Sequence, residues 1–328
     1  MTEQGFPAGQ GFPAGHGFPA GHGVPAGHGV PAEHHAPTGQ GPTAAAGTVP
    51  AQAVRLAVPL TPAVSATRAR RYGSWYFAEH TFRVMRRYAV SVLLYSVGQP
   101  LAYLFAMGIG LAALINANGG SQYAGVGYLT FLAPALVASA AMMSATGEFM
   151  FPIMDGFKWR RTFYGPHASP LSPEQIANGH IIGVTIRILL PTAIYFVIVV
   201  LFGAAPGPWA WVSIFTATLC ALSFGLPLMA YVSTIERDGG QFAIVQRFIV
   251  TPLFLFSGTF FPLATLPVFL QWIGWLSPLW HATQIGRVLS YGYPEPLWLS
   301  LLHVLYMLAT AVAGWRVAQR IFKRRLGR

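Results

Sequence analysis

The residues best suited to contact another molecule lie between Glu148 and His180, the longest polar interruption in an otherwise apolar chain. Three cations stand close together there, at Lys158, Arg160 and Arg161. The aromatic residues beside them are Phe157, Trp159, Phe163 and Tyr164. Cations interleaved with aromatic rings suit either lipid headgroups or a groove on a partner protein, and the residues alone do not decide between these. We call residues 148–180 the basic loop.

Turn signals divide the basic loop into parts. The prolines that prevent one continuous helix through it are Pro166, Pro170 and Pro173. Ser172 followed by Gln175 predicts a capping box that starts the next helix. About residues 149–164 are predicted to form a short amphipathic helix across the cytosolic surface. Glu148, at the end of the preceding apolar segment, is expected to pair with a nearby arginine.

A second unusual stretch, Ser257–Arg287, is apolar and aromatic but cannot form one spanning helix. The residues that break it are Gly258, Pro262, Pro267 and Pro278. Broken backbone at membrane depth needs cover from protein or a water-filled cavity, so we expect short re-entrant helices on the outer side. The tryptophans expected at the outer interface are Trp272, Trp275 and Trp280. His281 and Arg287 can carry charge; we predict structural roles for both, with substrate binding as the alternative. We call residues 257–287 the broken segment.

Motifs for ATP binding or hydrolysis do not occur in the sequence. A phosphate-binding loop needs a lysine followed by Ser or Thr after a glycine-rich turn. The two lysines, Lys158 and Lys323, are instead followed by Trp159 and Arg324. HExxH, GxSxG and paired intramembrane carboxylates are also lacking, and the single cysteine, Cys220, excludes a disulfide within the chain. We therefore expect no catalytic residue, metal or cofactor in this chain.

Composition indicates a protein that crosses a membrane several times. Hydrophobic residues make up 54% of the 328 residues and charged residues only 9%, whereas soluble domains carry about 25% charged residues. The net charge of +11 is concentrated at the ends of apolar segments. Nucleic-acid binding would instead need a basic face on a soluble domain. The positive charge is therefore interpreted as a topology signal.

Residues 1–67 differ from the rest of the chain. Residues 5–34 repeat a six-residue Gly-Pro unit five times, as in GFPAGH, and such a composition cannot build a packed core. We predict a disordered cytosolic tail over 1–67 and a membrane domain over 68–328. The repeated histidines offer metal chelation as the alternative role; they are His16, His22, His28, His34 and His35.

Helical periodicity begins near Arg68 and runs to Arg87. One predicted face carries Trp75, Ala78, Phe82 and Met85, and another carries Tyr76, His80, Arg83 and Arg87. A basic helix with an apolar face is typical of the membrane interface, where its cations approach anionic headgroups. The alternative is a solvated lead-in to the first span.

Six apolar segments are near or above the ~20 residues that a spanning helix needs. We predict spans at about 89–115, 124–146, 180–202, 209–234, 242–262 and 297–319. Prolines at Pro100, Pro134, Pro191 and Pro227 fall inside these segments. Prolines within spans are tolerated where neighbouring helices compensate for the lost hydrogen bonds, which favours a packed bundle.

Basic residues predict the orientation of these spans. One side would carry Arg68, Arg70, Arg71, Arg83, Arg86, Arg87, Lys158, Arg160, Arg161, Arg237, Arg316, Arg320, Lys323, Arg324, Arg325 and Arg328, and the other only Arg287. Both termini are therefore predicted to be cytosolic. Arg187 and Arg247 lie inside predicted spans near the cytosolic boundary. They are expected to snorkel, with a transport role as the alternative.

The order of these features resembles a known family. An interfacial basic helix and two spans precede FKWRRTFYGPHASPLSPEQIANGHI, and FSGTFFPLATLPVFLQWIGWLSPLWHATQIGR follows the fifth span. Together they resemble the membrane subunit of type-2 ABC exporters, in the branch of lipo-oligosaccharide and nodulation-factor permeases that includes antibiotic exporters. The resemblance covers about residues 68–328.

The resemblance implies an all-α membrane domain in the bacterial plasma membrane, assembled as a pair of permease copies. A separate ATPase subunit would bind ATP and Mg and dock at the basic loop, where the coupling residues would be Glu148, Phe157, Lys158, Trp159, Arg160 and Arg161. The broken segment would form an extracellular lid that includes Phe260, Phe261, Pro262, Trp272, Pro278, His281 and Arg287. The substrate would be an amphiphile: a glycolipid, a lipo-oligosaccharide, a polymeric glycan or a lipophilic drug.

Three other classes of membrane protein were weighed against an exporter subunit. A membrane-embedded transferase needs a polar catalytic cluster near the end of a span, and none stands out. A secondary transporter would show inverted repeats and buried carboxylates, which the sequence does not display. A structural or scaffolding protein would not need the broken segment. An ATP-binding cassette protein encoded beside this chain would favour the exporter.

Overall fold

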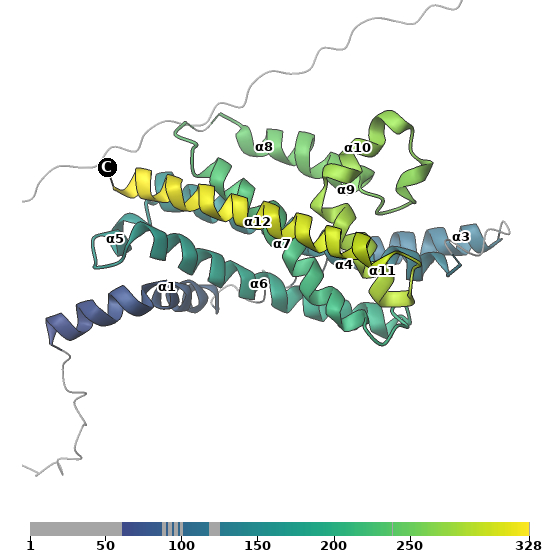
Figure 1. Cartoon of the computed structure of the whole chain (residues 1–328), viewed down its shortest axis with the longest axis horizontal. Coiled ribbons are helices and arrows are strands. Elements are labelled where there is room, and N and C mark those ends of the chain that lie inside the picture. The colour runs from purple at the N-terminus through teal and green to yellow at the C-terminus, as the bar shows by residue number, and fades with distance from the viewer. Residues whose placement is uncertain are drawn as a thin grey trace, which may run out of the picture. The chain divides into compact units, whose positions relative to one another are not determined.

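The computed structural model describes residues 61–86, 90, 94, 98, 101–117, 125–237 and 239–327, and these are mainly helical (Figure 1). The elements in chain order are α1 (Pro62–Arg86), η1 (Leu104–Leu111), α3 (Ala112–Ala117), α4 (Tyr128–Met154), η2 (Asp155–Trp159), α5 (Tyr164–His167), α6 (Pro173–Leu201), η3 (Ala210–Val212), α7 (Ser213–Val232), α8 (Gln241–Val245), η4 (Gln246–Val250), α9 (Thr251–Phe256), η5 (Leu263–Thr265), α10 (Val268–Leu276), α11 (Pro278–Tyr291) and α12 (Leu297–Leu326).

Among the described residues, four continuous helices are long and apolar enough to cross a membrane. They cover Tyr128–Trp159, Pro173–Leu201, Ala210–Val232 and Leu297–Leu326. These correspond to the second, third, fourth and sixth predicted spans. The predicted tail histidines, Arg87 and most of the first predicted span lie outside the described residues, and Leu101–Ile115 is the described apolar part of that span.

The fifth predicted span is shorter than expected. Its continuous helix covers Gln241–Phe256 instead of residues 242–262. The helix ends because Ser257 leaves the helical conformation and Gly258 adopts a left-handed φ of 70°, which glycine does without a Cβ clash. Six complete spans therefore remain a prediction.

The predicted surface helix at 149–164 is wrong. Residues 149–159 continue the second span, because α4 passes through Pro152 and merges into the π-helical turn η2. Phe149, Ile153 and Phe157 on this extension are buried. Burial of these large side chains offsets the hydrogen bond that Pro152 cannot donate.

Helix α1 confirms the helix predicted before the first span, with two corrections. It begins at Pro62, so residues 62–67 belong to the helix rather than to the tail. The predicted apolar face is only partly buried: Ala78 is buried, but Trp75 and Phe82 are exposed. The face that packs is centred on Phe77, because α6 presents Gly179 there, where a Cβ would lie 2.5 Å from the Ser74 carbonyl oxygen.

Close backbone approaches fix the long helices against each other. Helix α7 packs against both α4 and α12, and α1 lies alongside α6 (Figure 1). A Cβ at Gly314 of α12 would clash with the backbone of Pro227 in α7. A Cβ at Gly225 would clash with the Phe149 ring of α4. Small residues thus permit the tight helix contacts expected of a membrane bundle.

Candidate functional site

The connection between α4 and α6, which we call the α4–α6 turn (residues 155–172), is anchored by four aromatic rings. Phe157 is buried and its ring lies 5.2 Å from that of Phe163 and 4.6 Å from that of Phe322, centroid to centroid. Phe163 also faces Phe77 at 6.0 Å. These rings come from η2, the turn itself, α12 and α1. The turn is therefore fixed by packing against two other helices, α12 and α1.

Backbone geometry in the turn depends on two residues. Gly156 faces the Phe163 ring so closely that a Cβ would overlap it. Arg161 has a φ of 55°, a left-handed conformation that costs a residue with a Cβ roughly 1–2 kcal/mol. Strained backbone of this kind persists where surrounding structure enforces it, and it is often found at functional sites.

The exposed tip of the turn carries the residues that sequence reasoning proposed for coupling. Trp159, Arg160 and Arg161 are exposed, whereas Lys158 is half-buried. Arg160 donates to both carboxylate oxygens of Asp155, at 2.6 and 2.8 Å. Phe157, in contrast, is buried and supports the turn from inside. The tip thus presents a tryptophan and cations on a fixed base.

Side-chain contacts bring parts of α1 and α12 that carry arginines to the α4–α6 turn. The predicted capping box is confirmed, since Ser172 and Gln175 bond reciprocally at 3.2 and 2.9 Å. The Gln175 amide also donates to the Arg70 carbonyl of α1, at 2.7 Å. At the other side, Arg325 of α12 lies over the Phe157 ring and donates to the Ser233 carbonyl at 2.7 Å. Arg70 of α1 and Arg325 of α12 therefore lie beside the same turn as Arg160 and Arg161.

Glu148 lies away from the turn, inside α4, and it pairs with Arg187 of α6 at 2.7 Å. This confirms the predicted arginine partner. Both side chains line a cavity of about 740 Å³ between α4, α6 and the α8–η4 region, together with Phe151 and Phe242. Within the described residues, Glu148 Oε2 and Arg187 Nε are buried without a hydrogen-bond partner. Helix α6 begins at Pro173, so Arg187 lies about 21 Å along it and not near its start.

The broken segment folds into short pieces, as the sequence predicted. After α9 the chain bends, forms η5, and continues as the nine-residue helix α10 and the 14-residue helix α11. Phe260 packs against Phe254 at 5.1 Å, and its carbonyl accepts from the Tyr128 hydroxyl at 3.1 Å. The remaining proposed lid residues divide by burial: Pro278 is buried, Phe261 and Pro262 are half-buried and Trp272 is exposed.

Arg287 is the cation at the centre of the broken segment. Only 3% of its surface is exposed. Its guanidinium donates to the Gly258 carbonyl at 2.7 Å and to Gln284 at 3.1 Å, and it lies 3.9 Å from the centroid of the Phe131 ring. Burial lowers the pKa of Arg287 to about 10, so the side chain is still charged at neutral pH. It ties the bend after α9 to α11 and α4, which supports the predicted structural role.

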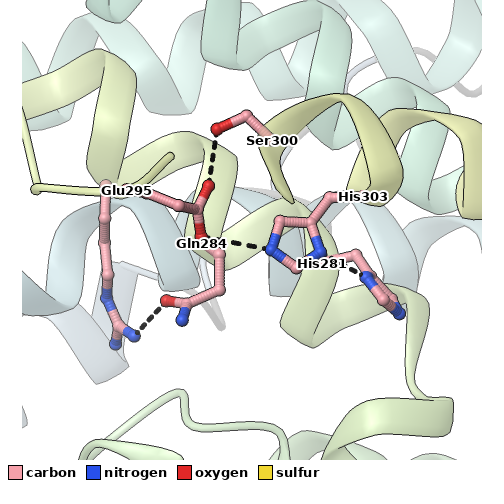
Figure 2. A network of polar contacts seen from close by, with 6 residues as sticks. His281, Gln284, Glu295, Ser300 and His303 are labelled. Atoms are coloured by element: carbon pink, nitrogen blue, oxygen red, sulfur yellow. Dashed lines mark hydrogen bonds and ion pairs between the residues drawn. The ribbon is translucent and has the colours of Figure 1, made fainter. Parts of the chain in front are cut away.

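A row of polar side chains joins the broken segment to α12 (Figure 2). His281 Nδ1 lies 2.7 Å from His303 Nδ1, and His303 Nε2 lies 3.2 Å from Glu295 Oε1. At the two ends of the row, His281 Nε2 bonds the Trp275 carbonyl at 3.0 Å and Ser300 bonds Glu295 Oε2 at 2.5 Å. The row is linear; among the described residues no three His, Cys, Asp or Glu side chains are placed to hold a metal ion.

The sequence analysis selected His281 but missed the two residues that continue the row, His303 and Glu295. His303 was treated as part of a featureless sixth span, and Glu295 fell in the linker before it. A usable signal existed. A histidine two turns inside an apolar helix, preceded by a carboxylate flanked by Pro294 and Pro296, places two ionisable groups at one helix start.

Comparison with known proteins gives a consistent result. Residues 75–291 match the family model described as ABC-2 type transporter. Proteins named nodulation protein J are similar over most of their length. The relative from Rhizobium leguminosarum bv. trifolii is 29% identical over 213 residues, covering 64% of this chain and 78% of the relative. The relative from Bradyrhizobium diazoefficiens is 28% identical over 248 residues, covering 74% and 89%. That from Rhizobium meliloti is 27% identical over 246 residues, with the same coverage.

The family match and the helices support the same conclusion. The matched range runs from α1 through α11 and includes both the α4–α6 turn and the broken segment. The four apolar helices of spanning length in the described part of the chain make it a multi-pass membrane protein. The chain belongs to the ABC-2 type transporter family.

Proposed function

We propose that this ABC exporter membrane subunit moves an amphiphilic substrate out of the cytoplasm or the inner leaflet, driven by a separate ATPase subunit. The observation that carries the proposal is the family match over residues 75–291. The relatives named for nodulation, and the resemblance to lipo-oligosaccharide and nodulation-factor permeases, favour a lipid-linked saccharide within the wider class of glycolipids, glycans and lipophilic drugs. The membrane would be the bacterial plasma membrane, with two copies of the chain paired in it.

The α4–α6 turn is the proposed docking site of the ATPase. Its tip exposes Trp159, Arg160 and Arg161, while Phe157 and Phe163 fix its base against α12 and α1. A partner that displaces the tip would move α4 directly, since the turn is continuous with that helix. Nucleotide can shift the transport domain only if the partner binds its two conformations with different affinity. A rigidly mounted tip allows such a difference to reach the spans.

Glu148 and Arg187 have a different proposed role from the tip. Their cavity of about 740 Å³ has the size of ligand pockets, and its mixed apolar and charged lining suits an amphiphile. Glu148 would therefore respond to substrate rather than to the ATPase. The broken segment, at the opposite end of α12 from Phe322, would close the outer end of the pathway.

The test is reconstitution with the ATP-binding cassette protein that we expect to be encoded beside this chain. The two proteins would be co-expressed, purified together into lipid, and assayed for ATP hydrolysis and for stimulation by lipid-linked saccharides. We expect a stable complex with robust hydrolysis. If the wild-type chain does not retain any ATPase subunit, the proposal fails and a secondary transporter or membrane-embedded transferase becomes the better account.

Variants at Arg161 identify what the tip contributes. Arg161→Ala and Arg161→Gly both remove the guanidinium, but only glycine adopts a φ of 55° without strain. Loss of coupled hydrolysis in both variants would assign the role to the cation. Recovery in Arg161→Gly alone would assign it to the backbone conformation, and normal coupling in both would exclude Arg161 from the docking site.

A further inference from the structure

The row from Glu295 to Trp275 requires a fixed number of protons. The Trp275 carbonyl can only accept, so His281 Nε2 must carry a proton toward it. One proton must also lie between the two facing Nδ1 atoms at 2.7 Å, and another between His303 and Glu295. The three hydrogen bonds therefore need three protons on two imidazoles and one carboxyl group.

Ordinary protonation states supply one proton too few. Two neutral imidazoles and an ionised carboxylate bring only two protons. The complete row thus contains one additional proton and has zero net charge: either Glu295 is protonated beside two neutral histidines, or Glu295 is ionised beside one imidazolium. Because His281 Nε2 is already a donor, a neutral His281 accepts at Nδ1 from His303. The additional proton then lies between His303 Nε2 and Glu295.

Burial makes this proton costly to remove. The side chains of His303 and Glu295 are 1% and 3% exposed, and His281 is 6% exposed. Without the proton, one unit of negative charge would be left in this dry site, and the single N–H of His303 could serve only one of its two contacts. Lone pairs would then face each other either between the two Nδ1 atoms at 2.7 Å or between His303 Nε2 and the Glu295 carboxylate at 3.2 Å. Separation of His281 from His303 would relieve both problems by admitting water.

We propose that Glu295, His303 and His281 form a one-proton binding site that fastens the broken segment to α12, and that loss of this proton releases the segment. The proton is the ligand of this site, and its binding holds the broken segment against α12. Tyr306 reinforces the closed form, because its ring stacks on His281 at 4.1 Å and its hydroxyl donates to the Leu276 carbonyl at 2.6 Å. This inference concerns the segment itself and holds whatever drives transport.

No other acidic or basic side chain on the surrounding described elements takes part in the row. Helix α10 contains no ionisable side chain, and α7 and the first turns of α4 contain no acidic or basic residue. On α11, Arg287 is directed to Gly258 and Gln284. The tyrosines on these helices and on α12 are Tyr128, which donates to Phe260, Tyr231, Tyr291 and Tyr306, and Tyr293 lies in the connection between α11 and α12. The row therefore has Glu295 as its carboxylate.

Glu295→Gln is the decisive variant. A glutamine amide donates permanently to His303 Nε2 and can accept from Ser300, so it completes the row without an additional proton. Glu295→Ala removes both functions, and Glu236→Gln at an exposed position of the chain is the matched control. Hydrogen exchange of the peptides that cover α10 and α11, corrected for intrinsic rates, would be followed in lipid over about pH 6 to 10.

For the wild type and Glu236→Gln, we expect opening of α10 and α11 to increase tenfold per pH unit above the pKa of the site, as release of one proton requires. Glu295→Gln should stay closed and show no such pH dependence. Glu295→Ala should be open throughout. The proposal is overturned if wild type and Glu295→Gln have the same pH dependence, or if Glu295→Gln is as open as Glu295→Ala.

A measurement on the wild type keeps the test valid if a variant fails to fold. Nitrogen-15 spectra of labelled histidines should show one protonated and one bare Nδ1 in contact at neutral pH. The signal of this Nδ1–Nδ1 contact should vanish at the pH where α10 and α11 open. Two protonated Nδ1 atoms, or two bare ones, at neutral pH would contradict the one-proton site. Neither experiment involves the ATPase, so failure here is distinct from failure of the proposed function.

Discussion

The α4–α6 turn and the broken segment lie at opposite ends of α12 and are held in different ways. Phe322 packs into the turn, and His303 bonds the broken segment, about 28 Å apart along the helix at 1.5 Å per residue. The turn is fixed by aromatic packing, with its polar groups at the exposed tip. The broken segment is fixed by buried hydrogen bonds, with its hydrophobic side chains exposed on α10.

This difference has a mechanical consequence. Aromatic packing is insensitive to proton or salt concentration, so the turn can transmit a displacement under varied conditions. Buried polar contacts hold only while every partner is present, because an unpaired group in a dry site is costly. The broken segment is therefore the end that can be switched.

Phe157→Ala should destabilise the chain most. Removal of a fully packed aromatic ring costs about 3–5 kcal/mol, and Phe157 contacts Phe163, Phe322 and Arg325. Unfolding in detergent by denaturant measures this loss. Trp159→Ala, two residues away and exposed, should change stability much less while weakening the ATPase complex. Equal destabilisation by the two variants would contradict the division between base and tip.

Arg287→Lys should be costly although it preserves the charge. Lysine lacks the planar fork that reaches both Gly258 and Gln284, and hydrogen bonds to a charged group contribute about 1.5–3 kcal/mol. Phe157→Leu, an equally conservative change at the other end, should cost less than Phe157→Ala because it retains apolar packing. If Arg287→Lys leaves the free energy of unfolding unchanged, the broken segment does not depend on the two hydrogen bonds of the Arg287 guanidinium.

Gly156→Ala tests the packing of the turn at the scale of one methyl group. Its Cβ would overlap the Phe163 ring, which is enclosed by Phe157 and Phe322, and overpacking costs typically about 1–3 kcal/mol. Gly147→Ala is the matched control on the same helix, since no atom lies within 4 Å of its Cβ position. We expect Gly147→Ala to be neutral or stabilising, because alanine favours helix. Destabilisation by Gly147→Ala of the same size would refute the steric explanation.

Low pH, like high pH, should destabilise the broken segment. Burial and the neighbouring His303 lower the pKa of His281 to about 4, from an ordinary 6.5. As pH falls from 6.5 toward 4 the unfolded chain takes up a proton that folded His281 does not, so stability declines across this window. Thermal unfolding should show this decline in the wild type and a smaller one in His281→Gln. Identical slopes would exclude His281 as its origin.

Long apolar segments, together with capping residues and helix-breaking glycines and prolines, made most of the fold predictable. Ser172 and Gln175 form the predicted capping box, and the breaks at Gly258 and Pro278 separate helices where expected. The error at residues 149–159 has a physical cause. Proline and glycine in that stretch favoured a break locally, but burial of Phe149, Ile153 and Phe157 kept the helix continuous.

The candidate sites were less predictable because they depend on contacts between distant residues. His281 could be singled out within its own segment, and His303 and Glu295 could be paired at the start of α12, but the sequence does not show that these two groups meet in space. Likewise, the sequence grouped Phe157 with Trp159 and placed Glu148 beside them. Tertiary packing buried Phe157 and turned Glu148 toward Arg187.

We propose that the tip of the α4–α6 turn receives the ATPase while the broken segment faces away from it. A photo-crosslinking amino acid placed at Arg161, and separately at the exposed Trp272, tests this directly in the co-expressed complex. We predict an adduct with the ATPase subunit from position 161 and none from position 272. An adduct from position 272, or none from 161 in a complex that hydrolyses ATP, would contradict the account.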